Sequence, residues 1–187
     1  PVNRSDPSGL QSIETFEDND KVQAGAASMP DYQGWAVVAG HGYEDGRVAI
    51  EGKVGTPTQL YSRLTEAGYK NGTPVILLNC NTARGSFASG LAKLTGGLVY
   101  AAGGFVRIPR DEQARQSHTY ESYTGRNRTG QRSGWIPFNG KGPTSGRGID
   151  RISVSNDGKR MTFQFDAQTG TRIRQQLTID IDEKKDK

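Results

Sequence analysis

One cysteine and two histidines are the residues of this chain best suited to nucleophilic chemistry at neutral pH. Cys80 directly follows the apolar stretch PVILLN, and His41 directly follows the apolar stretch WAVVAG. His118 lies in a different stretch, rich in arginine and glycine. An imidazole beside a thiol favours the thiolate and can protonate a leaving amine. His41 and Cys80 therefore predict a catalytic dyad for acyl transfer.

The elements around these two residues predict an α/β fold. Alternating apolar stretches and helical periodicities indicate strands over Gly34–Gly40, Thr73–Asn79 and Leu98–Gly104, a helix after Thr56 and Pro57 that ends at Gly68, and a helix over Ala83–Leu94. The order strand, helix, strand, helix, strand is typical of parallel connections. Ligands of such sheets bind beyond the carboxyl ends of the strands, where both candidate residues would lie.

Two backbone amides, those of Gly42 and Cys80, could together stabilise an oxyanion. A helix beginning near Ala83 would also direct its positive end toward the thiolate. The alternative is structural, because a lone cysteine after an apolar strand is often a packing residue, and so is a lone histidine. The position of both residues at strand ends favours the dyad.

The rest of the chain divides by composition into segments of one domain. Its 187 residues suffice for a single core. We expect a flexible leader over 1–33, an α/β core over 34–106, an irregular Arg- and Gly-rich segment over 107–148 anchored by Trp135 and Phe138, a β-hairpin extension over 149–182 and a charged tail over 183–187. Arg47–Val54 alternates like a half-exposed strand, and the hairpin turn is expected at Asn156-Asp157-Gly158.

Composition excludes several classes of function. The single cysteine rules out an intrachain disulfide, and one cysteine with two scattered histidines offers no metal-ligand pattern. No apolar run is long enough for a membrane span. The net charge of +4 is too small to indicate nucleic acid by itself. The arginines of the irregular segment could bind nucleic acid or inositol phosphate, but acidic residues dilute their charge; the arginines are Arg107, Arg110, Arg115, Arg126, Arg128 and Arg132.

The stretches WAVVAGHG and PVILLNC resemble the signature of the caspase-like (clan CD type) cysteine peptidases, which include caspases, legumain, gingipains, separase and self-cleaving domains of large bacterial toxins. His41-Gly42 and Asn79-Cys80 match that signature in order and spacing. The stretch NCNTARGSFASGLAKLTGGLVYAAGG resembles the cysteine-bearing segment of caspase-like domains in bacterial polymorphic toxins and secreted effectors. The resemblance covers about residues 34–106.

The resemblance implies a caspase-like, mostly parallel sheet flanked by helices, to which this chain adds a C-terminal β-rich extension. It implies that Cys80 is the nucleophile, that His41 activates it or protonates the leaving group, and that the amides of Gly42 and Cys80 hold the oxyanion. No cofactor is implied. The dyad usually suffices in this group, and a third, orienting residue is optional.

Four residues near the dyad are candidates for orientation or specificity. Asp45 and Glu44 lie close to His41 in the sequence, although a carboxylate in a turn is more often solvated. The chain departs from the family pattern at Asn79, where caspases prefer a small residue, and at Arg84, where toxin relatives often have glycine.

These features together predict a cysteine endopeptidase, as a bacterial toxin, effector or autoprocessing domain that cleaves a protein or peptide substrate. The absence of a starting methionine and of a signal-peptide core favours a piece of a longer polypeptide, secreted or delivered into a target cell and acting in a reducing cytoplasm. An inhibitor or immunity protein is a further expected partner; nucleic acid is not. Two alternatives stay open: an inactive caspase-like module that binds through its basic segment, and a non-peptidase toxin enzyme that uses the same cysteine.

Overall fold

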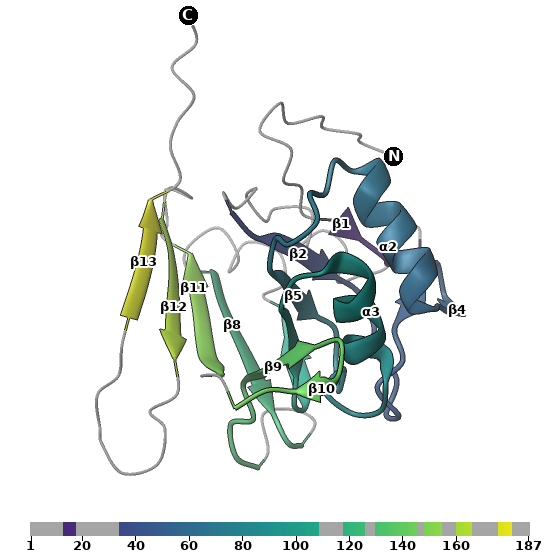
Figure 1. The fold of residues 1–187 in the computed structure, drawn as a ribbon. Helices are drawn as coiled ribbons and strands as arrows, with labels where there is room; N and C mark the ends of the chain where they lie inside the picture. The colour runs from purple at the N-terminus through teal and green to yellow at the C-terminus, as the bar shows by residue number, and fades with distance from the viewer. Residues whose placement is uncertain are drawn as a thin grey trace, which may run out of the picture.

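The computed structural model of the chain describes residues 13–17, 34–108, 118–125, 130–145, 148–154, 160–165 and 176–180. Over these ranges the fold is α/β, with one eleven-stranded mixed sheet, a separate two-stranded ribbon and two helices (Figure 1). The elements are β1 (Ile13–Glu14), β2 (Ala36–Ala39), β3 (Ala49–Ile50), β4 (Lys53–Val54), α2 (Pro57–Glu66), β5 (Val75–Leu78), α3 (Phe87–Thr95), β6 (Val99–Ala102), β7 (Phe105–Arg107), β8 (His118–Tyr123), β9 (Trp135–Asn139), β10 (Gly142–Pro143), β11 (Ile149–Val154), β12 (Arg160–Phe165) and β13 (Gln176–Asp180).

The large sheet is parallel at one end and antiparallel at the other. Strand β2 pairs in parallel with β1 and β5, and β5 pairs in parallel with β6. Antiparallel pairing then continues from β6 through β9, β11 and β12 to β13, with β8 also on β11 and β7 on β8. The predicted α/β class is confirmed, but the sheet is mixed rather than mostly parallel. Parallel pairing needs crossover connections, and the helices among the described residues lie in the connections between β2, β5 and β6.

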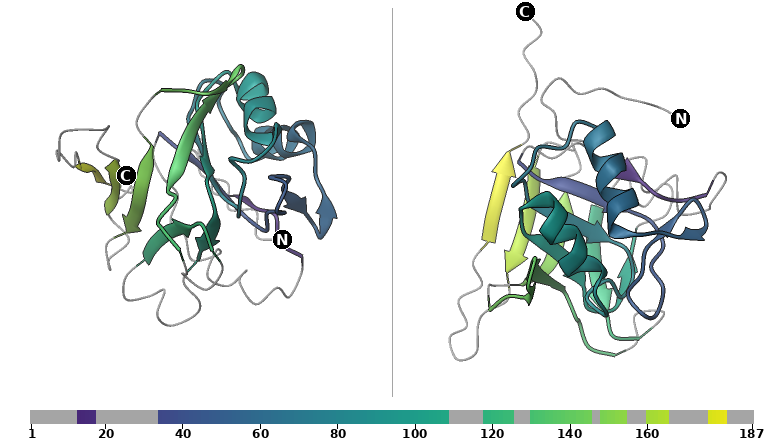
Figure 2. Two further views of the ribbon diagram at one scale, coloured as in Figure 1. Left: turned by 90° about the horizontal axis from the view of Figure 1, so that it is seen from below. Right: turned by 45° about the vertical axis from the view of Figure 1, so that its right-hand side comes forward.

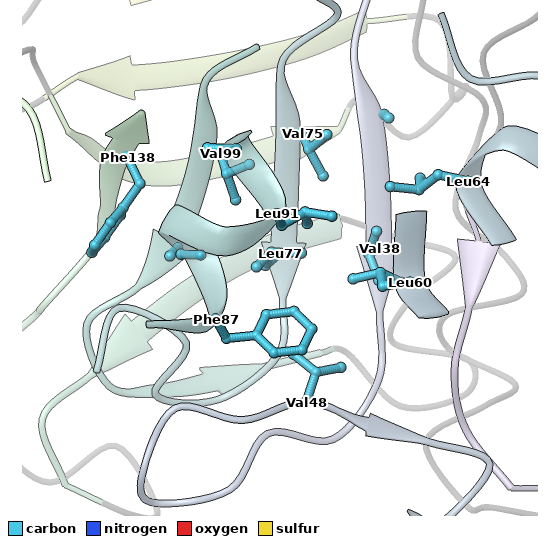
Figure 3. Packing of buried hydrophobic residues seen from close by; sticks show 14 of the residues in the cluster. Val38, Val48, Leu60, Leu64, Val75, Leu77, Phe87, Leu91, Val99 and Phe138 are labelled. Carbon is cyan, nitrogen blue, oxygen red and sulfur yellow. The ribbon is translucent and has the colours of Figure 1, made fainter. Parts of the chain in front are cut away.

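Both described helices pack on one face of the parallel strands. Leu60 and Leu64 of α2 and Phe87 and Leu91 of α3 are buried there (Figure 3). The sheet contributes alternate residues of β2, β5 and β6 to this core, namely Ala36, Val38, Val75, Leu77, Val99 and Ala101. Helix α2 begins as predicted, because the Thr56 side chain and Gln59 form a capping box.

The opposite face of the parallel strands is covered by the sheet itself. Its core contains Val37, Ile76 and Tyr100 together with residues of the antiparallel strands β8, β11 and β12, which are Tyr120, Ile152 and Phe163. The ring of Trp35, next to β2, stacks on Phe163 with centroids 4.8 Å apart. Strands β2 and β12 are far apart in the sheet order, so the sheet must curl strongly to bring them together. The expected flanking of the sheet by helices is therefore corrected, because α2 and α3 lie together on one face of the sheet (Figure 2).

Helix α3 begins at Phe87, about one turn later than predicted. Asn81 and Gly85 have φ angles of 58° and 73°, and such left-handed residues cannot continue a right-handed helix. Residues 80–86 therefore form turns between β5 and the helix. The predicted stop is confirmed, since Gly96 forms a left-handed C-cap with φ 67°.

Strands also occur in segments that were predicted to lack them. Within the leader, Ile13–Glu14 pairs with β2, and Thr15 and Phe16 are buried. The segment predicted as irregular contains β8, β9 and β10, with Trp135 and Phe138 buried in β9 as expected. Ser122 faces inward from β8 and is fully buried, which hides the apolar alternation of this strand.

Two further predictions have different outcomes. The C-terminal hairpin is confirmed, because β11 pairs antiparallel with β12 and β13 adds to β12. Arg47–Val54 is not one strand but the small ribbon of β3 and β4, separated by Glu51 and Gly52 with φ angles of 50° and 71°. The Asn156–Gly158 turn, the tail over 183–187 and four of the six arginines of the basic segment, Arg110, Arg115, Arg126 and Arg128, lie outside the described residues.

The helix face of the core provides a direct test of the packing. Replacing the fully buried Leu91 by alanine should lower the free energy of unfolding by about 2–5 kcal/mol, because it removes apolar contacts and leaves a cavity. Urea denaturation measures the effect. The matched variant Leu98→Ala, at a position 39% exposed, should cost about 0.5 kcal/mol. Equal losses for the two variants would contradict this packing.

Candidate functional site

The register of two neighbouring strands brings His41 and Cys80 to the same edge of the sheet. Ala39 of β2 lies opposite Leu78 of β5. His41 comes two positions after Ala39, and Cys80 comes two positions after Leu78. Neighbouring strands lie about 4.8 Å apart. The main chains at His41 and Cys80 therefore emerge side by side at the carboxyl ends of parallel strands.

The backbone at Gly42 lies against the peptide of Cys80. A Cβ atom added to Gly42 would lie 1.9 Å from the carbonyl oxygen of Cys80 and 2.8 Å from its nitrogen and carbonyl carbon. Backbone atoms cannot yield as the end of a flexible side chain can. A glycine is thus required where these two segments meet.

Two more glycines continue the contact between the segments, which we name the His loop (41–47) and the Cys loop (80–86). A Cβ on Gly46 would lie 1.6 Å from the carbonyl oxygen of Arg84, and a Cβ on Gly85 would lie 2.7 Å from that of Asp45. The Arg84 guanidinium also donates a hydrogen bond to the carbonyl of Glu44, with Nη1 at 3.4 Å. The two loops run along each other backbone to backbone.

The amide of Gly42 makes no hydrogen bond within the described part of the chain. Gly42 forms a bridge with Val48, but its hydrogen bonds are made by neighbours: Tyr43 donates to Arg47, and Ala49 donates to the carbonyl of His41. Among the described residues, the Gly42 N–H has no acceptor. An oxyanion donor needs an amide without an acceptor of its own.

The Cys80 sulfur lies against the main chain of β7. The Val106 N–H donates to Sγ at 3.4 Å, and the Val106 carbonyl lies 3.9 Å from Sγ. Cys80 is partly exposed, so it is not a thiol fully enclosed in the core, as the structural alternative would require. The N–H favours the thiolate, whereas a carbonyl that accepts from the thiol favours the neutral form, so the main chain of Val106 can bond the sulfur in either state.

His41 is exposed, and its main chain is held from two sides. Its carbonyl accepts hydrogen bonds from the Ala49 N–H at 2.9 Å and from the Asn79 side-chain Nδ2 at 3.3 Å. The ring of Phe16 contacts the imidazole with centroids 5.1 Å apart and planes at 88°. The side chains of Phe16 and Asn79 and the main chain of Ala49, which come from three separate segments, thus meet at His41.

The four candidates for orientation or specificity fall into two groups. Asn79 is fully buried and bonds the main chain of His41, so its contact is orienting and it cannot line a substrate pocket. Asp45 is exposed and pairs with Arg47, whose hydrogen bond lowers the pKa of this carboxyl group. Glu44 and Arg84 lie on the exposed rim where the two loops meet.

The turn before helix α3 separates that helix from the thiol. The helix dipole acts mainly within the first turn, and six residues lie between Cys80 and Phe87 along the chain. The expectation that the helix N-terminus begins just after the thiol was therefore wrong. Local electrostatic support at Sγ comes instead from the Val106 amide.

One described arginine of the basic segment is paired with acidic side chains, and so is a neighbouring arginine of β11. Arg132 lies 2.8 Å from Glu121 and 3.5 Å from Asp150, and Arg151 lies 2.9 Å from the same Glu121 carboxylate. Tyr123 donates a hydrogen bond to Glu121, which raises the pKa of the tyrosine. These ion pairs join β8, β11 and the approach to β9.

Sequence reasoning missed Phe16 and Val106. Phe16 lies in a polar stretch that resembled a leader, and its pairing partner is distant in the sequence. Val106 follows Gly103-Gly104 after the third strand of the predicted sheet. The glycine pair at the end of β6, the neighbour of β5, was the signal that could have indicated Val106.

A family model, described as a domain of unknown function (DUF8616), matches residues 11–119 of this chain. The chain belongs to this family. The matched range of DUF8616 runs from β1 into the start of β8, so it contains Phe16, the His loop, the Cys loop and Val106. Searches of curated proteins and of solved structures each gave no match.

Neither described helix of this DUF8616 protein has the length and apolar character of a membrane span. Within the described ranges, no three His, Cys, Asp or Glu side chains gather as a metal site would require. His118 is the first residue of β8 and lies opposite Val154 of β11. It is far from the His loop and the Cys loop in the sequence.

The contact between Gly42 and Cys80 predicts a severe effect of a single methyl group. Gly42→Ala should lower the free energy of unfolding by about 1–3 kcal/mol and slow the alkylation of Cys80, because the loops must separate. Thermal unfolding and iodoacetamide labelling measure the two effects. In the control Gly72→Ala the new Cβ meets nothing within 4 Å, so alkylation should stay at the parent rate, although the φ of 89° strains an alanine there and lowers the stability. Parent-like stability and labelling of Gly42→Ala would refute the contact.

Proposed function

We propose that this DUF8616 protein is a cysteine peptidase with Cys80 as nucleophile and His41 as general acid and base. The observation that carries the proposal is the parallel register of β2 and β5, which aligns Ala39 with Leu78 and so brings the two residues to adjacent strand ends. The exposure of His41 and the partial exposure of Cys80 support access by a substrate.

The first half of the reaction acylates the cysteine. The Cys80 thiolate attacks the carbonyl carbon of the scissile peptide, forming a C–S bond and a tetrahedral oxyanion. The protonated His41 then gives its proton to the leaving amine as the C–N bond breaks. The products of this half are an amine and a thioester on Cys80.

The second half restores the enzyme. Neutral His41 takes a proton from water, which attacks the thioester carbonyl. The C–S bond breaks, a carboxylic acid leaves, and the proton on the imidazole stays with the regenerated thiolate–imidazolium pair. No cofactor enters either half of the reaction.

The main chain around the dyad supports charge stabilisation. The N–H of Gly42, which has no acceptor among the described residues and lies next to the Cys80 peptide, is the proposed oxyanion donor, together with the amide of Cys80 itself. Val106 lies opposite Ser122 of β8, and its N–H and C=O face the sulfur of Cys80.

The caspase-like arrangement is part of the same proposal. A parallel block of strands carries His-Gly at the end of one strand and Asn-Cys at the end of its neighbour, in the chain order implied by the resemblance. The proposed substrate is a protein, either another protein or the polypeptide to which the domain belongs, as in toxin and effector autoprocessing domains.

Substitutions of the dyad test the proposal. Cys80→Ala should abolish peptide cleavage while the thermal unfolding curve stays near that of the parent. His41→Ala should lower kcat/KM about 10²–10⁴-fold, since it removes general acid–base catalysis. Cleavage is measured on a peptide library with mass-spectrometric detection of new termini. His118→Ala is the matched control and should keep parent activity. Cleavage by Cys80→Ala at the parent rate would sink the proposal.

The pH dependence of alkylation gives a second test that needs no substrate. With His41 present, the rate of Cys80 labelling by iodoacetamide should reach half its maximum at a pH below the value of about 8.5 that is typical of free cysteine. In His41→Ala the profile should move toward that value, because the imidazolium no longer stabilises the thiolate. Identical profiles for the two proteins would show that His41 does not activate the thiol.

A further inference from the structure

An aromatic contact links the candidate histidine to a segment distant in the sequence. The rings of Phe16 and His41 have centroids 5.1 Å apart and planes at 88°, an edge-to-face arrangement. Phe16 is only 7% exposed and belongs to the core that lies beneath the parallel strands. The contact therefore joins an exposed functional residue to a fixed part of the interior.

The main chain on both sides of Phe16 is tied to the parallel end of the sheet. Ile13 and Glu14 pair with Val38 and Ala39 of β2, and the Thr15 N–H donates to the Ala39 carbonyl at 2.9 Å. The Thr15 carbonyl in turn accepts a hydrogen bond from the N–H of Glu51 at 3.1 Å. The segment 13–17 is thus held between β2 and the β3–β4 turn, directly beside the strand that ends at His41.

The hydrogen bonds to the His41 main chain do not define the orientation of its ring. Ala49 and Asn79 hold the carbonyl of His41, and these bonds act on the main chain rather than on the ring, whose orientation is set by the side-chain torsions. A buried aromatic ring perpendicular to the imidazole restricts rotation about those torsions. General acid–base catalysis requires the ring nitrogen to face the reacting atoms.

We propose that Phe16 is a positioning residue for His41: its ring holds the imidazole in the orientation that serves Cys80. The inference rests on the proposed function for its catalytic meaning, but the contact itself is independent of any activity. It makes the segment 13–17 part of the site, although this segment is separated from His41 by more than twenty residues of sequence.

Nuclear magnetic resonance of the full chain tests the contact, because the chain has only two histidines and their ring signals are easily resolved. In the parent, the ring protons of His41 should show a nuclear Overhauser effect to Phe16 and a ring-current shift. In Phe16→Leu the shift of His41 should disappear, while that of His118 stays unchanged. In the same variant, iodoacetamide labelling of Cys80 at neutral pH should slow about two- to tenfold, the change that corresponds to loss of one aromatic pair.

Two matched variants separate positioning from general packing. Phe163→Leu removes a buried aromatic ring from the same core, where it stacks on Trp35, and should leave the His41 signals and the labelling rate unchanged. Phe16→Tyr retains the ring and should retain the His41 shift. The inference is overturned if the parent shows no Phe16–His41 Overhauser effect, or if Phe163→Leu changes the His41 signals as much as Phe16→Leu does.

The two proposals fail in different measurements. Parent-like cleavage by Cys80→Ala would reject the peptidase, whereas the His41 signals would still report whether Phe16 holds the imidazole. Conversely, unchanged His41 signals in Phe16→Leu would reject the positioning role, whatever the outcome for Cys80. A change in the signals without a change in the labelling rate would also reject that role, since the orientation would then not matter to the thiol.

Discussion

The candidate site depends on the backbone contact between Gly42 and Cys80. Parallel pairing of β2 with β5 brings the two strand ends together, but it leaves the loops beyond them free to diverge. The glycines remove that freedom, because a peptide of each loop occupies the space that a Cβ of the other would need. Gly42, Gly46 and Gly85 form a seam along which the His loop and Cys loop run in contact.

Besides the His loop and the Cys loop, strand β7 also contacts the site, because the sheet curls after β6. After β6, Gly103 and Gly104 let the chain turn into β7, and the carbonyl of Gly104 accepts a hydrogen bond from Asn81 at 2.7 Å. The amide of Gly104 donates to the buried Ser122 hydroxyl of β8. The Cys loop is thereby joined to the antiparallel strands, and Val106 is brought to the sulfur. The strands that complete the core on one face also build the surroundings of the thiol.

The polar residues around the thiol are unusual for their degree of burial. Asn79 and Asn81 flank Cys80 and are both fully buried, yet the Asn79 Oδ1 and both side-chain polar atoms of Asn81 have no hydrogen-bond partner among the described residues. Each such atom costs about 1–3 kcal/mol. Asn81 also adopts a left-handed conformation, which asparagine tolerates better than most residues. The apolar core beneath the loops must offset this cost, and costly features of this kind cluster at functional sites.

The sequence by itself determined the parallel core, because buried parallel strands are continuous apolar runs and helix α2 carries its own cap. It also made His41 and Cys80 the candidate residues, since both follow such runs directly. The later start of α3 was not predictable from apolar spacing, because it depends on the backbone conformations of Asn81 and Gly85. Only the tertiary structure decided that β2 and β5 are neighbours, that the sheet curls, and that Phe16 and Val106 reach the site. Those features arise from contacts between residues distant in the chain, which local periodicity does not encode.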